Sequence, residues 1–119
     1  MSEEMDVSVF NGVYPIRPGK EDDARAFAAE TFGARRPDFE AHMERDSITR
    51  ETWTLQETPM GSFMLVWFDG DVERAFTWLA TDTSDYAVWF RAQVLDVTGV
   101  DMATPPGGPP PAVLIDWPA

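Results

Sequence analysis

The run Ser62–Phe68 (SFMLVWF) most constrains what this chain can fold into. A strand with one face in water alternates apolar and polar residues, whereas this run is apolar on both faces. We therefore predict a strand that is covered by helices on one face and by a further surface on the other. A single copy with the second face bare would expose a large apolar patch, which soluble monomers rarely do.

The residues before this run predict two strands that enclose a pair of helices. Residues 7–17 and 48–58 alternate as strands do, and a proline late in the first strand suggests an edge. Three carboxylates from Glu21 onward favour a helix N-terminus, because the helix dipole attracts anions there. Pro37 fits the first turn of a second helix. The order strand–helix–helix–strand therefore leads into the central run.

A similar order is expected after the run. Asp71 is placed to cap one helix, and Ser84 to cap a longer helix from Asp85 to about Val97. Residues 104–111 (TPPGGPPP) hold five prolines and two glycines, so they form an arm without regular structure. Residues 112–117 (AVLIDW) then predict a short final strand.

The expected order is thus β-α-α-β-β-α-α-β over one domain, residues 1–119. Two β-α-β halves of this kind give an α+β, ferredoxin-like domain with a four-stranded antiparallel sheet and helices on one face. In element order and length, from Val7 to Trp117, the chain resembles the dimeric α/β-barrel superfamily, which includes antibiotic-biosynthesis monooxygenases and small polyketide cyclases. The resemblance implies a homodimer whose two sheets pack face to face as a closed barrel, often with the C-terminal segment reaching the partner.

Composition argues against several classes of function. The 119 residues include 9 basic and 21 acidic side chains, a formal charge of −12, which opposes binding to nucleic acid. No window is apolar over the ~20 residues of a spanning helix, so no membrane partner is expected. The acidic N-terminus is unlike a secretory signal, which favours a cytoplasmic protein. Without cysteine there is no disulfide framework and no thiolate zinc site.

His42 is the one histidine of the chain, and its ordinary pKa lies near neutrality. On a helix, Asp38 and Asp46 lie four residues before and after it, on the same side. An imidazole oriented by a carboxylate is a common general base, so His42, Asp46 and Asp38 form a candidate catalytic set. The alternative is a surface or interface histidine among common acids. A metal site is not expected, because one imidazole among scattered carboxylates lacks a specific ligand spacing.

Aromatic residues on two strands and two helices form a second candidate group. They fit the lining of a cleft between sheet and helices for a flat aromatic molecule, with indole N–H groups as donors. In the resembled monooxygenases and cyclases, flat polyketides bind in such a pocket. The alternative is that these rings fill the core and a dimer interface. The candidate substrate-binding residues are Trp53, Trp67, Tyr86, Trp89 and Arg91.

Two further charged residues bear on these groups. Arg91 lies in an otherwise apolar helix, where a buried guanidinium needs a carboxylate or a ligand. A guanidinium that reaches the surface to pair with an aspartate is the alternative. Glu51, a third acid after the two beside His42, points to the same side of its expected strand as Trp53 and Leu55.

The sequence supports two classes of function. The first is a small-molecule enzyme without metal or organic cofactor that acts on a flat aromatic or polyketide-like substrate, as a cyclase, isomerase or monooxygenase. His42 would be the base, oriented by Asp38 or Asp46, and Arg91 or Trp53 would stabilise developing negative charge. The alternative is a non-catalytic homodimer that binds a small aromatic metabolite or is purely structural. Sensitivity to substitution of His42 separates the two.

Overall fold

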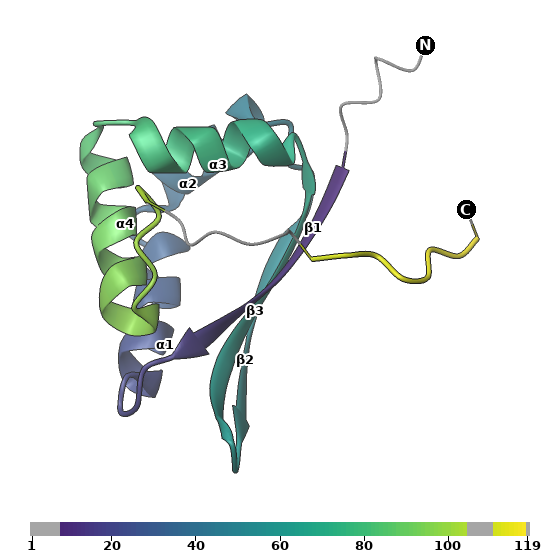
Figure 1. Ribbon diagram of the computed structural model, residues 1–119. Helices are drawn as coiled ribbons and strands as arrows, with labels where there is room; N and C mark the ends of the chain where they lie inside the picture. The colour runs from purple at the N-terminus through teal and green to yellow at the C-terminus, as the bar shows by residue number, and fades with distance from the viewer. Residues whose placement is uncertain (1–7, 105–110, 119) are drawn as a thin grey trace.

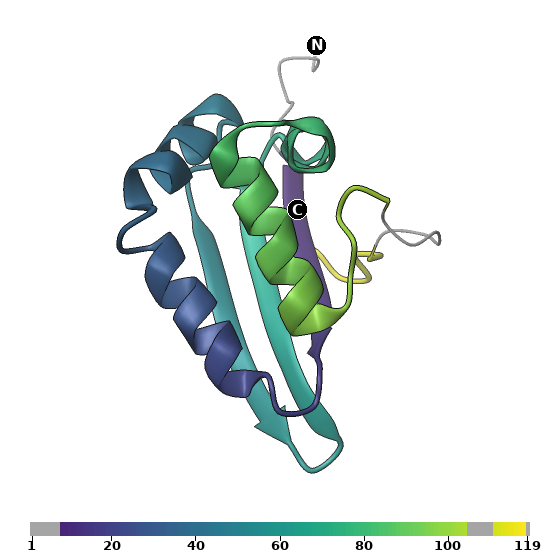
Figure 2. The same cartoon turned by 90° about the vertical axis from the view of Figure 1, so that its left-hand side faces the viewer.

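The computed structural model describes residues 8–104 and 111–118. The elements are β1 (Ser8–Ile16), α1 (Glu21–Thr31), α2 (Arg36–Arg45), β2 (Glu51–Thr58), β3 (Gly61–Gly70), α3 (Val72–Thr81) and α4 (Asp85–Thr98). The strands form one antiparallel sheet in the order β1-β3-β2, and the helices lie on one face of it (Figure 1 and, from the helical side, Figure 2). No helix within the described ranges is long and apolar enough to cross a membrane.

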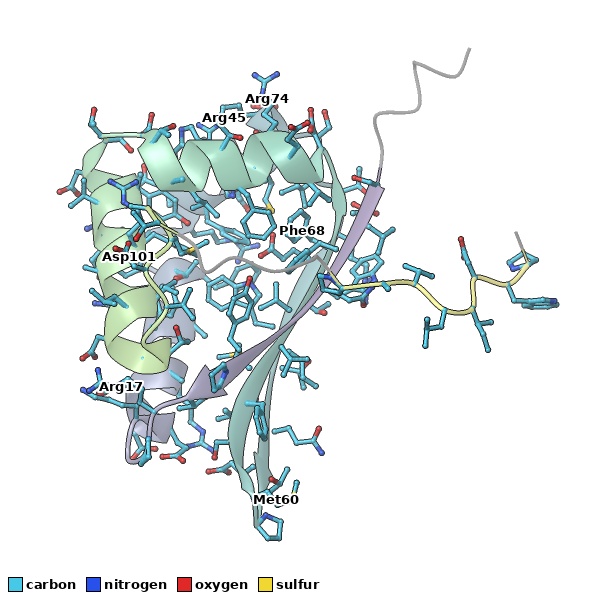
Figure 3. All side chains as sticks on the ribbon, viewed as in Figure 1. Arg17, Arg45, Met60, Phe68, Arg74 and Asp101 are labelled. Atoms are coloured by element: carbon cyan, nitrogen blue, oxygen red, sulfur yellow. The ribbon has the colours of Figure 1, made fainter. Side chains whose placement is uncertain are left out.

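The apolar run is a strand, as predicted, and it is the central one of the sheet. β3 pairs along its length with β1 on one side and with β2 on the other. Met64 and Phe68 are buried against the helices, and Phe68 is seen between the sheet and the helical layer in Figure 3. Leu65 and Trp67 point to the opposite face and are only half-buried. The alternation of side chains along a strand explains this difference.

Aromatic packing and helix caps fix the helices on the sheet. The rings of Phe27 on α1 and Phe90 on α4 lie 5.1 Å apart, in an edge-on arrangement. The predicted caps are present, because Asp71 accepts the backbone N–H of Arg74 and the Ser84 hydroxyl accepts that of the third residue of α4. The helical layer is therefore specified both by local capping and by long-range contacts.

The C-terminus corrects the predicted fold. Residues 112–117, expected as a fourth strand, are irregular and exposed. They pass β1 beside Pro111 and run away from the sheet (Figure 1). Their backbone groups therefore form no ladder of hydrogen bonds with a strand, although their side chains are apolar. Over residues 8–104 and 111–118 the domain is therefore α+β with a three-stranded sheet in the order β-α-α-β-β-α-α, not the predicted four-stranded ferredoxin-like sheet. Most of the proline-rich arm, 104–111, lies outside the described residues.

One face of the sheet, called here the open face, has no helix over it in the described chain. Its side chains are Val9, Asn11, Val13 and Pro15 of β1, Phe63, Leu65 and Trp67 of β3, and Thr52, Thr54 and Gln56 of β2. Asp69, which accepts hydrogen bonds from Thr49, lies at one end of this face, where Arg50 directly precedes β2, and the strand side chains named above carry no charge. Since 25% of the whole chain is charged, this neutrality sets the open face apart.

Candidate functional site

An apolar cavity of about 80 Å³ lies between the sheet and the helices. All three strands and helices α1, α3 and α4 contribute to its wall. Its aromatic lining residues are Tyr14, Phe27, Trp53, Phe68, Phe76 and Phe90. Glu51 is the single acidic side chain among the residues that line it, and no lysine or arginine lines it. The cavity is therefore an aromatic chamber with one carboxyl group.

A second hollow of about 190 Å³ adjoins this chamber between α1, α2 and β2. Phe32 and Phe39 contribute to its wall, together with small residues of α1. Glu51 and Trp53 line both hollows, so they form the wall that the two share. Glu51 therefore lies at the boundary between the two hollows.

The Glu51 carboxyl group is poised to exchange a proton near neutral pH. Burial raises the pKa of Glu51 to about 7, against the opposing effect of one hydrogen bond. That bond comes from Trp53, whose Nε1 donates to Oε2 at 2.7 Å. Among the described residues no other donor reaches this carboxyl group. A carboxyl with a pKa near 7 in a hollow is a good general acid or base.

Strand geometry places Glu51 in the cavity. It begins β2 opposite Phe68 of β3, and side chains at this register point toward the helices. Trp53 and Leu55 follow on the same face, as the alternation in the sequence predicts. The candidate catalytic set did not include Glu51. The available signal was an acidic residue on the side of a strand that otherwise carries Trp53 and Leu55.

The charge of Glu51 affects the pKa values of two tyrosines. Burial raises the pKa of Tyr14, which lines the cavity, and the Glu51 carboxylate raises it further. Burial also raises the pKa of Tyr86 on α4, with smaller effects in the same direction from Glu51 and Asp38. The Tyr86 hydroxyl is buried and has no hydrogen-bond partner among the described residues. Tyr86 is therefore close to the site, although it lines neither hollow.

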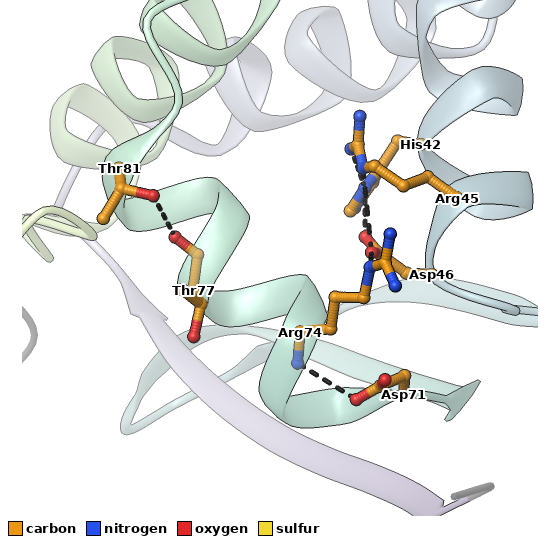
Figure 4. Close-up of polar contacts among 7 residues, drawn as sticks. All are labelled: His42, Arg45, Asp46, Asp71, Arg74, Thr77 and Thr81. Carbon is orange, nitrogen blue, oxygen red and sulfur yellow. Dashed lines mark hydrogen bonds and ion pairs between the residues drawn. The ribbon is translucent and has the colours of Figure 1, made fainter.

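His42 lies on α2 outside both hollows, and Figure 4 shows it beside Arg45 and Asp46. It is 5% exposed and stacks on Trp78 of α3, with ring centroids 4.8 Å apart. Burial, together with the charge of Arg45, lowers the pKa of His42 to about 4. Nη2 of Arg45 is 2.9 Å from Nδ1 of His42. Because its pKa lies well below 7, the ring is neutral at pH 7.

Asp46 is the buried centre of this cluster. Its Oδ2 lies 2.8 Å from Nδ1 of His42, and its Oδ1 lies 3.7 Å from Nε of Arg45 and 3.5 Å from Nε of Arg74. Neither carboxylate oxygen has an aligned hydrogen bond among the described residues. Burial raises the pKa of Asp46, and the two arginines oppose that rise. Asp38 is exposed and faces Arg35 instead, at 3.8 Å.

The remaining predicted site residues are spread over the molecule. Trp53 reaches the cavity, whereas Trp67 lies on the open face. Trp89 packs beside the core under the guanidinium of Arg35, whose Cζ is 4.7 Å from the ring centroid. Nη1 of Arg91 donates to the backbone carbonyls of residues 79 and 82, each at 2.8 Å, and so caps the C-terminus of α3. Arg91 needs neither a carboxylate nor a ligand there.

Within residues 8–104 and 111–118, no group of three His, Cys, Asp or Glu side chains is placed to hold a metal ion. Comparison with protein-family models, curated proteins and solved structures gives no significant match to this chain. The functional interpretation therefore rests on the geometry around Glu51.

Proposed function

We propose that this protein is a small-molecule enzyme that needs no metal or organic cofactor and that uses Glu51 for proton transfer. One observation carries the proposal: a carboxyl group with a pKa near 7 and no lysine or arginine beside it lines an aromatic cavity. The outer hollow gives this group a route to the surface. A flat, apolar substrate suits the walls, and its reaction would begin with loss of a proton and lead to an isomerisation, a cyclisation or, with molecular oxygen as the oxidant, a monooxygenation.

The geometry suggests how the first step would proceed. Ionised Glu51 takes a proton from a carbon next to a carbonyl group, and the electron pair of the broken C–H bond moves toward the carbonyl oxygen. Trp53 holds Oε2 by its hydrogen bond, which leaves Oε1 for the proton. Tyr14 lines the same cavity and supplies a hydroxyl donor for the developing enolate oxygen. The protonated carboxyl group then returns the proton at another carbon.

An activated carbon acid tests this role before the natural substrate is found. In 5-nitrobenzisoxazole, a base removes the one proton on the heterocyclic carbon, the N–O bond breaks, and a coloured cyanophenolate forms. We expect catalysis faster than that by free acetate, with a rate that rises with pH through about 7. Glu51→Gln should reduce the rate at least about 100-fold.

Two matched variants complete this experiment. Glu57→Gln changes an exposed glutamate on the same strand, paired with Arg25, and should leave the rate unchanged. His42→Gln tests the base expected from the sequence, and should also leave it unchanged because His42 lines neither hollow. Equal rates in Glu51→Gln and Glu57→Gln would refute the proposed role of Glu51.

We further propose that two copies associate through the open face. Val13 is 65% exposed there, beside an uncharged surface of Leu65 and Trp67. The apolar segment 112–117 adds exposed side chains next to β1, with Leu114 90% exposed. Burial of this apolar surface would stabilise a dimer by roughly 25 cal/mol per Å² of area removed from water. The same surface also supports the alternative of a non-catalytic homodimeric module.

Sedimentation velocity tests the association. The protein should sediment as a dimer at micromolar concentration, and Val13→Lys and Leu65→Lys should each shift it to the monomer. Leu95→Lys is the matched control, since Leu95 is an apolar residue of α4 with 48% exposure on the opposite layer. A monomer in the unaltered protein, or dissociation by Leu95→Lys alone, would overturn the proposed surface.

A further inference from the structure

We infer that the cavity beside Glu51 takes a small aromatic amine, bound as its ammonium ion with the nitrogen at the Glu51 carboxylate. The inference names the ligand class of the site proposed above. It depends on the cavity and its charge and not on any catalytic step.

The first argument is the missing counter-ion. Glu51 lines both hollows, and no lysine, arginine or histidine is among the residues that line either of them. A buried carboxylate without a cation is unfavourable, and a ligand that brings a positive charge removes that penalty. A ligand with a carboxylate or phosphate would be repelled by the Glu51 carboxylate, and no cationic side chain on the walls would offset that repulsion.

The second argument is the character of the walls. The Trp53 ring lies 5.1 Å from that of Phe27 and 5.9 Å from that of Phe90, and all three line the cavity. Phe39 meets Trp53 nearly perpendicularly at 6.4 Å from the side of the outer hollow. The faces of aromatic rings attract cations, and their flat surfaces pack against an aromatic body. The carboxylate therefore suits the ammonium group of an aromatic amine, and the surrounding rings suit its aromatic ring.

The third argument concerns selection between ligands before they reach the site. The chain carries a formal charge of −12, so its long-range field concentrates cations around it and depletes anions. Neutral molecules gain nothing from this field. The inner cavity of about 80 Å³ and the adjoining outer hollow of about 190 Å³ together admit a single ring with a short side chain.

Three ligands of nearly equal shape test the inference: benzylamine, benzyl alcohol and benzoate. Binding to the full chain at pH 7.5 is followed by tryptophan fluorescence and by calorimetry. We expect benzylamine to bind at least about tenfold more tightly than benzyl alcohol, and benzoate not to bind. In Glu51→Gln the preference for benzylamine should disappear, whereas Glu57→Gln should retain it.

The outcomes are distinct from those of the proton-transfer assay. Equal affinity for benzylamine and benzyl alcohol, a preference that survives in Glu51→Gln, or no binding of any of the three would each overturn the amine assignment. Selective amine binding without turnover of the benzisoxazole would support the ligand class and refute the catalytic role. Turnover without amine selectivity would do the reverse. Thermal melts of each variant confirm that the fold is retained.

Discussion

Among the described residues, the fully buried carboxyl group of Asp46 and the half-buried one of Glu51 differ in what surrounds them. Asp46, at the end of α2, lies among Arg45, Arg74 and His42. Glu51, at the start of β2, lies among aromatic rings with no cation beside it. The first arrangement joins the end of α2 to α3 through the Asp46–Arg74 ion pair. The second places a proton acceptor next to a cavity. Burial of a carboxyl group is therefore not enough to identify a candidate functional site, whereas burial next to a cavity and without a counter-ion is.

We expect the largest effect on the free energy of unfolding from a substitution of Asp46. Asp46→Ala leaves the buried His42 and the partly exposed Arg45 without their central acid, and should lower the free energy of unfolding by about 3 kcal/mol. Urea denaturation measures it. Asp38→Ala, an exposed site on the same helix, should change the stability by less than about 0.5 kcal/mol. Similar values for both variants would mean that the Asp46 cluster does not hold α2 in place.

The Glu51 carboxyl group should act on stability in the opposite direction. Its pKa is about 7 in the folded chain against an ordinary value of 4.5, so the folded state binds more protons between these values and loses stability as pH rises through them. Glu51→Gln removes this penalty and should stabilise the protein by about 3 kcal/mol at pH 8. Urea midpoints from pH 4 to 8 measure the slope. A variant no more stable than the parent at pH 8 would contradict the buried, uncompensated charge.

His42 should give a slope of the other sign, and no effect at neutral pH. Its pKa is about 4 in the folded chain against 6.5 ordinarily, so the unfolded state binds more protons in that window and stability falls as pH drops through it. The loss approaches about 3 kcal/mol near pH 4. NMR of the single imidazole should show a neutral ring down to about pH 4. Titration near 6.5 would place His42 in solvent.

The smallest expected effect sharpens the description of Glu51. Trp53→Phe keeps an aromatic ring but removes the N–H that stabilises the ionised carboxylate. The pKa of Glu51 should therefore rise further, and the rate profile of the benzisoxazole reaction should move to higher pH with it. Infrared spectra of the carboxyl stretch against pH measure the shift directly. A pKa that stays in place or falls would show that the hydrogen bond has little influence.

Local patterns in the sequence were sufficient for much of the fold. The helix caps at Asp71 and Ser84 and the apolar run of β3 are each determined within a few residues, and they are confirmed. The fourth strand at 112–117 was wrong because a strand also needs a backbone partner. Whether such a partner is available depends on the tertiary structure, which the apolar composition of a segment does not determine.

The site was less accessible to sequence reasoning. Spacing correctly brought His42 and Asp46 together on one helix, at 2.8 Å. It did not reveal that Trp78 of α3 covers the ring and lowers its accessibility to solvent. For Glu51, the side of the strand was predicted, but its pKa depends on how deeply α1 and α4 bury β2. Distances between elements decide that depth, and a periodic pattern does not contain them.

The neutrality of the open face decides how salt would act on self-association. Two copies, each with a formal charge of −12, repel one another while they approach, and dissolved ions weaken this repulsion over a Debye length of about 10 Å at 0.1 M. The uncharged surface itself has few ion pairs for salt to weaken. Rising ionic strength should therefore strengthen the dimer, whereas it would weaken a complex held together by opposite charges. In a buffer of low ionic strength, the monomer should be favoured.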